Sequence, residues 1–358
     1  MKKILFSGFL LVSLSWVLPA APKTFDMYLI DTEGGKSLLL VSPSGESMLI
    51  DTGFPGSDDR DAKRIAEAVK AANLKQVDHL VTSHYDGDHV ANVAATAARV
   101  TIKTFYDHGD AAVKDPRTTE SVRQYFALAA KAKRVVVKPG DKIPFKGIDV
   151  LVLTAGGKHI TTPVKGGGAP NPYCKDTQPM KWTRTDEDNS ENGNAVGLLF
   201  TYGKFRMVDL ADLTWNREME LMCPNNPIGS VDLFMVSHHG LKMSNAKFLV
   251  HALRPKAAIM NNGAKKGDER QTATVLVTSP GIVNSWQLHY AVDSSPDNNA
   301  APDRIANPQQ QPDPQSFGYV LGDQGDYIKV SAQENGDFTV TNSRNGFTQT
   351  YKKREYHQ

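Results

Sequence analysis

The chain has 358 residues, of which 40% are hydrophobic and 22% are charged. This composition is typical of a folded globular protein and excludes a disordered or fibrous chain. The formal net charge is +2, and loss of Lys2 and Lys3 would bring it to zero. A neutral surface excludes bulk electrostatic attraction as a way to hold nucleic acid.

The N-terminal stretch, residues 1–21, has the pattern of a secretory signal peptide. Lys2 and Lys3 precede an almost wholly apolar run over residues 4–17, and small residues follow it at Ala20 and Ala21. A membrane anchor is the alternative, but the run is shorter than the roughly 20 residues that cross a bilayer. We therefore expect an exported protein, periplasmic or secreted, with no membrane contact once the signal is removed.

Two cysteines, Cys174 and Cys223, are present. In an exported protein they are expected to form one disulfide, with two buried free thiols as the alternative. They do not form a CxxC pair, so their spacing does not suit zinc.

Apolar periodicity predicts strands and helices that alternate in each half of the chain. Strands are expected at 24–30, 36–50 (with a turn at 43–45), 78–82, 100–106, 195–202, 205–210, 231–236, 257–260 and 282–288. Helices are expected at 59–72, 88–98, 120–132, 215–222, 245–253 and 270–278. This order indicates an α/β protein with two mixed sheets sandwiched between helices.

Three segments complete the predicted organisation. Residues 156–194 lack any sustained period and read as a long loop, which is uncommon unless it binds or covers something. Residues 294–315 are a Pro/Asn/Gln-rich surface segment, and 318–351 alternate like a β-hairpin around Asn335-Gly336. We expect one domain over residues 22–295, with residues 296–358 adding a surface loop and the hairpin to the same domain.

The strongest chemical signal is the segment Ser83-His84-Tyr85-Asp86-Gly87-Asp88-His89, which follows the apolar strand at 78–82. It places four metal-ligand types, His84, Asp86, Asp88 and His89, within six positions. A loop at the end of a rigid strand can aim several side chains at one point. Imidazole and carboxylate suit zinc, iron and manganese. The alternative, a polar turn with a helix-capping Asp, does not need two His and two Asp together.

Three further strand ends carry polar groups. His238 and His239 follow one apolar strand and precede Gly240, and Asp212 follows another. A carboxylate there could bridge two metals, although a strand-end Asp alone is a weak signal. Asp51 also ends a strand, and we expect a structural role in which its carboxylate holds the His-bearing loop by hydrogen bonds.

The order of these motifs, IDTG, then SHxDxDH, then an Asp at a strand end, then SHHG, resembles the metallo-β-lactamase superfamily. Within it, the likeness is greatest to the soluble domain of DNA-uptake competence proteins and related secreted hydrolases. The resemblance covers residues 25–288 and implies an αββα sandwich with one or two divalent metals at the edge between the sheets. Zinc is the first expectation, and manganese is the alternative.

The resemblance also implies roles for individual residues. His84 and Asp86 would serve a first metal, Asp88 and His89 a second, and Asp212 would bridge both. His239 would complete the second site and His238 would face the substrate in a catalytic role, although which of this pair binds metal is open. Asp88 would hold the metal-activated water and shuttle its proton.

This chain departs from the family pattern at two places. Asp86 stands where many members have a second His, and a further His before the later strand pair is missing. There the chain carries Asn192 and Asn194, which are expected to orient substrate or complete the first site. His108 and His159 are alternative ligands, although surface positions are the stronger expectation for both.

The substrate is expected to be a phosphodiester, on the competence-type resemblance. Lys158, Lys165 and Lys175 on the middle loop could approach an anionic substrate, with an ordinary solvated surface as the alternative. His289 ends a later strand and could face the site, with a packed His as the alternative. Competing functions are hydrolysis of a lactone or β-lactam, and a non-catalytic binding protein that retains the fold.

Overall fold

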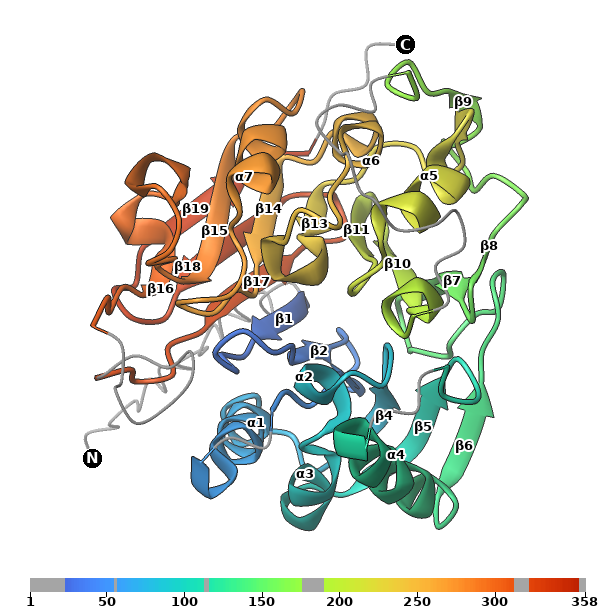
Figure 1. The fold of residues 1–358 in the computed structure, drawn as a ribbon, viewed down its shortest axis with the longest axis vertical. Helices are drawn as coiled ribbons and strands as arrows, with labels where there is room; N and C mark the ends of the chain where they lie inside the picture. Colours follow the sequence, from blue (N-terminus) through green and yellow to red (C-terminus); the bar gives the residue numbers. More distant parts are fainter. Residues whose placement is uncertain (1–22, 55–56, 113–115, 176–189, 312–321, 354–358) are drawn as a thin grey trace, which may run out of the picture.

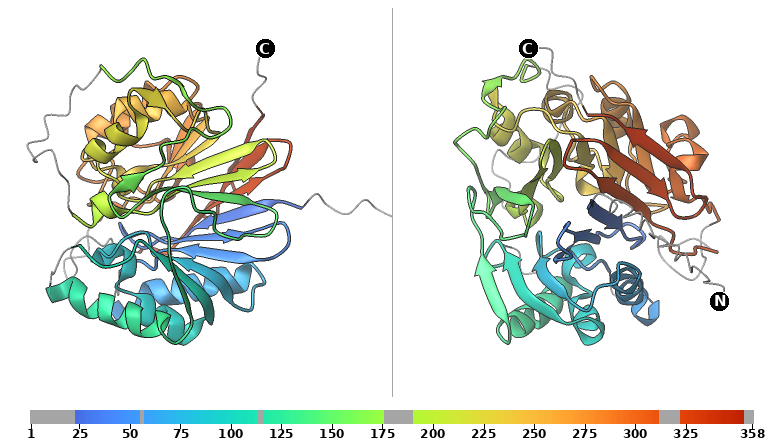
Figure 2. Two further views of the ribbon diagram at one scale, coloured as in Figure 1. Left: turned by 90° about the vertical axis from the view of Figure 1, so that its right-hand side faces the viewer. Right: turned by 180° about the vertical axis from the view of Figure 1, so that it is seen from behind.

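The computed structural model describes residues 23–54, 57–112, 116–175, 190–311 and 322–353. Two large sheets pack face to face, with helices on the outer side of each (Figure 1, Figure 2). The αββα sandwich expected from the sequence is therefore confirmed. The expected signal peptide, residues 1–21, lies outside the described residues.

The first sheet has the strand order β19-β18-β17-β1-β2-β3-β4-β5-β6. Strands β3 to β6 pair in parallel, and the other pairs are antiparallel. The strands are β1 (Phe25–Leu29), β2 (Leu38–Val41), β3 (Ser47–Ile50), β4 (Val77–Val81), β5 (Ile102–Asp107), β6 (Lys133–Val136), β17 (Ile328–Ala332), β18 (Phe338–Asn342) and β19 (Thr348–Tyr351).

The second sheet has the order β16-β15-β14-β13-β11-β10-β7-β8. Strands from β11 to β16 pair in parallel. The strands are β7 (Asp149–Ala155), β8 (Lys158–His159), β10 (Gly197–Tyr202), β11 (Phe205–Asp209), β13 (Leu233–Met235), β14 (Ala257–Met260), β15 (Asn284–His289) and β16 (Ile305–Asn307). A separate small pair is formed by β9 (Ala169–Pro170) and β12 (Asn225–Asn226).

The helices divide between the two outer faces (Figure 2, left). The first half of the chain supplies α1 (Arg60–Ala71), α2 (Gly87–Val90), α3 (Val93–Arg99) and α4 (Pro116–Ala129), and the second half supplies α5 (Trp215–Met222), α6 (Lys247–Leu253) and α7 (Arg270–Val277). Three apolar layers result, one between the sheets and one under each set of helices.

Strand alternation explains why both faces of a sheet are apolar. In β1, Phe25, Met27 and Leu29 lie in the core between the sheets, whereas Tyr28 lies on the helix side. Successive side chains of a strand point to opposite faces, so each strand serves two layers. The sheets can therefore be covered on both sides, and their loops, rather than their faces, are left to form a site.

Several segments differ from the expected elements, because six strands were not expected: β6, β7, β8, β9, β12 and β16. The single helix expected at 88–98 is two short helices, α2 and α3, separated at Asn92, whose φ of −98° and ψ of 10° interrupt the helix. The tail has the expected hairpin, β17 and β18 around Asn335-Gly336, and a third strand, β19. Strand β17 pairs with β1, so residues from both ends of the described chain share one sheet.

Candidate metal centre

Loops at the ends of three strands meet at one edge of the sandwich. The 84–89 segment follows β4 of the first sheet, and the 209–212 and 237–240 segments follow β11 and β13 of the second. Four of the residues singled out from the sequence form one group whose ligand atoms all lie within 4.8 Å of one another: Asp88, His89, Asp212 and His239.

Distances within the group fit a shared central ion. The Nε2 atom of His239 lies 3.0 Å from Asp88 Oδ2 and 3.3 Å from Asp212 Oδ2. The Nε2 atom of His89 lies 3.2 Å from Asp212 Oδ2 and 3.5 Å from Asp88 Oδ2. Two imidazoles thus face the same two carboxylates.

Burial opposes the charged form of each carboxylate, but neighbouring cations outweigh it and hold the pKa of Asp88 and of Asp212 well below the usual range.

The imidazoles themselves indicate a missing partner. His84, His89 and His239 are all buried, and the Nε2 atom of each makes no hydrogen bond among the described residues. A buried polar atom without a partner is costly and needs an explanation. Each outer nitrogen, by contrast, has one: Nδ1 of His84 contacts Ser83 Oγ at 3.1 Å, and Nδ1 of His239 contacts Asn261 O at 3.0 Å. Metal-binding histidines have this arrangement, with one nitrogen on the ion and the other held by a neighbour.

Asp51 holds the His-bearing loop, as expected from the sequence. Its carboxylate accepts hydrogen bonds from the Ser83 N–H at 2.7 Å and the Ser83 hydroxyl at 2.6 Å. The same carboxylate lies 2.8 Å from Nδ1 of His89, and both residues are fully buried. Asp51 itself has a φ of 60°, an uncommon backbone state that persists where the surroundings impose it.

The turn at 237–240 also contains residues with positive φ angles. His238 and His239 have φ values of 52° and 55°, which turn two adjacent imidazoles toward the site. Gly240 has a φ of 90°, and a Cβ there would come within 2.5 Å of Met260 Sδ. A glycine at position 240 is therefore what this backbone path requires. Asn245 ties the turn down, accepting from Ser237 N at 2.9 Å through its side-chain oxygen.

His84 and Asp86 form a pair beside the main group. The His84 ring lies 4.0 Å from the His89 ring, and its Nε2 atom is 3.6 Å from Asp86 Oδ2. Asp86 is 41% exposed, whereas the side chain of His84 is fully buried. The structure thus brings four of the six expected ligands into one group and places the other two next to it.

Asn192 and His238 face each other across the site. The Asn192 amide nitrogen is 3.4 Å from His238 Nε2, and His238 Nε2 is 3.5 Å from Asp212 Oδ2. Burial lowers the pKa of His238 to about 4 despite the nearby Asp212, so its imidazole is neutral at pH 7. Asn194 takes no part in this contact, because its amide donates to Ser190 O at 2.8 Å.

His289 is placed differently from the expectation. It is fully buried, and its Nε2 atom lies 2.7 Å from Asp31 Oδ1. Arg64 joins Asp31 and Asp323, each at 2.8 Å, so these residues form a separate charged cluster that ties the C-terminal segment to α1. Its contacts are those of a packed His rather than of a substrate-facing one, because the ring has no exposed surface.

His108 also differs from the expectation, because it is buried rather than at the surface. Its Nε2 atom lies 3.1 Å from Glu191 Oε2, and the same oxygen accepts from Tyr85 N at 3.0 Å. His159 is half-buried, with Nδ1 2.9 Å from Ile160 O. Both therefore lie outside the group of four. The three middle-loop lysines are exposed: Lys158, Lys165 and Lys175.

Two lysine–carboxylate contacts, one of them buried and the other partly buried, were missed from the sequence. Lys36 pairs with Asp209, which leaves Asp212 as the carboxylate of that strand end that faces the histidines. Lys266, from the loop after β14, pairs with Asp88 inside the group itself. No sequence signal marks either lysine, because each partner lies more than a hundred residues away.

The family model of the metallo-beta-lactamase superfamily matches residues 31–175, which include Asp51 and the 84–89 loop. Residues 31–175 are therefore similar to a metallo-β-lactamase superfamily domain. Asp212 and the 237–240 turn lie beyond the matched stretch and close the same site in space. The metallo-β-lactamase domain and its His/Asp cluster together support a metal-dependent hydrolase.

Three proteins similar to this chain share little of its sequence. ComE operon protein 3 of Bacillus subtilis (strain 168) is 23% identical over 267 residues, which are 70% of this chain and 30% of that protein. The chain thus spans less than a third of the length of this relative. CmlA, a diiron beta-hydroxylase from Streptomyces venezuelae, is 16% identical with a TM-score of 0.39, over 69% of this chain and 46% of CmlA. A diphosphatase of the PhnP family is 12% identical with a TM-score of 0.37, over 72% and 94%. Such low TM-scores carry no argument about activity.

Among the described residues, no helix combines the length and apolar character that crossing a membrane requires.

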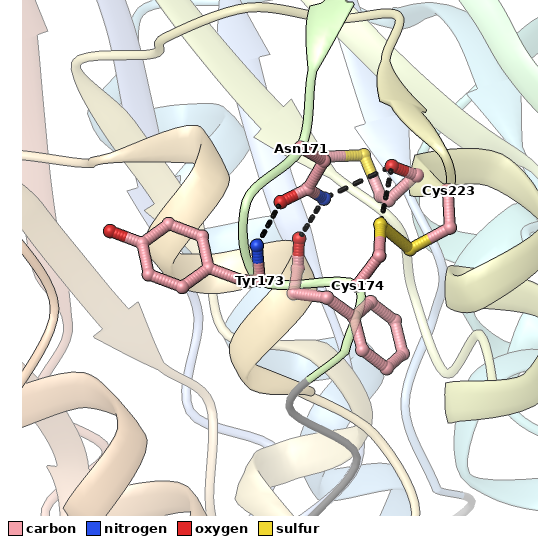
Figure 3. Close-up of a disulfide and its surroundings, with 6 residues drawn as sticks. Asn171, Tyr173, Cys174 and Cys223 are labelled. Carbon is pink, nitrogen blue, oxygen red and sulfur yellow. Dashed lines mark hydrogen bonds between the residues drawn. A yellow bond between two sulfur atoms is a disulfide. The ribbon is translucent and has the colours of Figure 1, made fainter.

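One disulfide is present, between Cys174 and Cys223, as expected from the sequence (Figure 3). It joins the middle loop to the end of α5, across 49 residues of sequence. Beside it, the Asn171 amide donates to Met222 O at 3.0 Å and to Phe248 O at 2.8 Å, which fixes the loop against α5 and α6.

Proposed function

We propose that the protein is an exported, metal-dependent hydrolase of phosphodiester bonds. The observation that carries the metal dependence is the set of buried imidazole Nε2 atoms without a hydrogen-bond partner, facing two ionised carboxylates. The substrate class rests on the competence-type resemblance, which the similarity to ComE operon protein 3 supports. Zinc is the first expectation for the ion, and manganese is the alternative.

In this proposal, the residues of the site are assigned to two ions and to proton transfer. Asp88, His89, Asp212 and His239 would hold one divalent ion, and His84 with Asp86 would hold a second. A bound divalent ion supplies Lewis acidity and lowers the pKa of water to about 7. Asp88 would take the proton of the attacking water at a carboxylate oxygen and pass it to the leaving alcohol as the phosphorus–oxygen bond breaks.

His238 and Asn192 would act on the substrate. In the arrangement that satisfies both, the Asn192 amide donates to Nε2 of His238, and Nδ1 of His238 donates to Ser244 Oγ at 3.2 Å. The Ser244 hydroxyl in turn donates to Leu213 O at 2.7 Å. This chain orients the His238 ring, so we propose His239 as the metal ligand. Neutral His238 would hold the Asn192 amide, whose second N–H would donate to a phosphoryl oxygen.

The export part of the proposal is supported by the disulfide between Cys174 and Cys223, because such bonds persist in oxidising compartments. The apolar N-terminal run is the second support. Mass spectrometry of the periplasmic and medium fractions would find a chain beginning near residue 22; a protein retained in the cytoplasm with its N-terminus intact would contradict export.

The deciding experiment combines metal quantification with a substrate panel. We expect purified protein to contain at least one divalent ion and to hydrolyse bis-p-nitrophenyl phosphate with added Mn²⁺ or Zn²⁺. Turnover of only nitrocefin or a homoserine lactone would replace the phosphodiester proposal by a carbonyl one. Protein without metal, whose behaviour is unchanged by His89→Ala, would support a non-catalytic role.

A further inference from the structure

Lys266 places a positive charge at the edge of the proposed metal site. Its ammonium donates to Asp88 Oδ2, the oxygen that lies 3.0 Å from His239 Nε2 and 3.5 Å from His89 Nε2. The ammonium therefore occupies the carboxylate oxygen that two imidazoles also face. A positive ion bound by these residues would have to share that oxygen with Lys266 or displace it, because like charges repel at this range.

The backbone holds Lys266 at this position. The Gly263 N–H donates to Lys266 O at 2.9 Å, which closes the loop after β14. Gly34 packs against it so closely that a Cβ there would lie 3.2 Å from Lys266 Cβ. Gly267 follows with a φ of 97°, and a Cβ there would overlap His239 O. The loop thus fixes the start of the side chain, and only the four-carbon stem can move.

The lysine side chain also lies on the solvent side of the four proposed metal ligands, Asp88, His89, Asp212 and His239. It is 32% exposed, whereas the side chains of His89 and His239 are fully buried. The Phe54 ring lies 5.5 Å from its ammonium and forms one wall beside it. An ammonium released from Asp88 would therefore remain within reach of the same group of residues, because its backbone is fixed and Phe54 packs beside it.

We propose that Lys266 is a substrate-binding residue, whose ammonium holds an anionic phosphoryl oxygen once the ion occupies Asp88. This inference rests on the proposed function and names the recognition group for its substrate. A lysine ammonium has three donors on a flexible stem and binds phosphate as a compact point charge. It would hold the non-bridging oxygen of the diester on the solvent side of the group, and the Asn192 amide, held by His238, would donate to the same phosphoryl group from another loop.

The test measures binding of inorganic phosphate by titration calorimetry to zinc-loaded protein whose metal content is known from elemental analysis. Lys266→Met should weaken phosphate binding by about tenfold or more, the loss expected for a charged hydrogen bond. Lys266→Arg should retain most of the affinity because it keeps the charge. Lys265→Met is the matched control, since Lys265 is the exposed neighbour on the same loop, and it should bind phosphate as the wild type does.

Zinc affinity, measured against a competing chelator without phosphate, separates this role from a metal-supporting one. Lys266→Met should bind zinc at least as tightly as the wild type, because a competing cation has been removed. Unchanged phosphate binding in Lys266→Met would overturn the inference, as would loss of zinc from that variant or a zinc-loaded wild type that binds no phosphate. A wild type that holds no metal would instead overturn the proposed function.

Discussion

The carboxylate of Asp51 lies 2.8 Å from Nδ1 of His89, and both side chains are completely buried. This contact directs the opposite nitrogen of the ring, Nε2, toward Asp212 at 3.2 Å. Because Asp51 also binds Ser83 through two hydrogen bonds, one carboxylate sets the path of the loop and the orientation of its imidazole. The precision of the metal group therefore depends on a residue that does not belong to it.

Asp51→Asn should weaken zinc binding by roughly 10- to 100-fold, the range seen when a partner behind a metal-binding His is lost. The amide keeps the size of the carboxylate but removes the charge that favours the N–H at Nδ1. Ser83→Ala is the comparison. It removes one bond to Asp51 and the partner of His84 Nδ1 but leaves the contact between Asp51 and His89, so it should have a smaller effect on the ion that His89 would hold. Chelator competition measures both. Equal zinc affinity in Asp51→Asn and wild type, with the fold intact by circular dichroism, would contradict this role.

Alanine substitutions of His238 and His239 should have different effects on bound metal and on turnover. His239→Ala removes an imidazole that faces both Asp88 and Asp212, so we expect loss of bound metal. His238→Ala removes a ring held by Asn192 and Ser244, so metal content should be retained while turnover falls. Elemental analysis beside kinetics on bis-p-nitrophenyl phosphate measures both. The assignment is reversed if His238→Ala is the variant that loses the metal.

Removal of the disulfide should destabilise the protein without changing the site directly. Cys174→Ser with Cys223→Ser opens a loop closed over 49 residues, and a loss of about 2–4 kcal/mol in unfolding free energy is typical. Chemical denaturation of the oxidised wild type and the double variant gives the difference. Wild type treated with reductant is the control, and it should approach the stability of the variant.

Glu218 should make stability fall as pH rises. Burial raises the pKa of its carboxyl group to about 8, although the N–H groups of Asn245 and Ala246 oppose the shift. The folded state therefore keeps a proton that the unfolded state releases near pH 4.5. The stabilisation is complete below that pH and is lost as pH rises through about 8.

Glu218→Gln should remove this component of the pH dependence, because the amide does not titrate. Unfolding free energies from denaturant titrations between pH 5 and 9 measure the slope, and the partly exposed Glu220 on the same helix provides the control variant, Glu220→Gln. A wild type whose stability is flat or rises over this interval, with the two variants alike, would show that Glu218 is ionised in the folded protein.

Local patterns in the sequence determined the sandwich and most of its elements. Helix α5 and strand β14 have the bounds expected from periodicity, because an apolar repeat is a property of neighbouring residues. The 84–89 loop, Asp212 and the 238–239 pair were identified in the same way, since unusual polar residues at strand ends are visible without coordinates. Asp51 was assigned its supporting role because it, too, ends a strand.

Only the tertiary structure decided which of these groups meet and what else joins them. His289 and His108 end in separate buried pairs with Asp31 and Glu191, and Lys266 joins Asp88 across 178 residues. Such contacts depend on how loops from two sheets converge, and no local period or motif spacing records that convergence. The sequence therefore indicated the types of metal ligand, whereas tertiary packing decided that the Lys266 ammonium contacts one of them, Asp88.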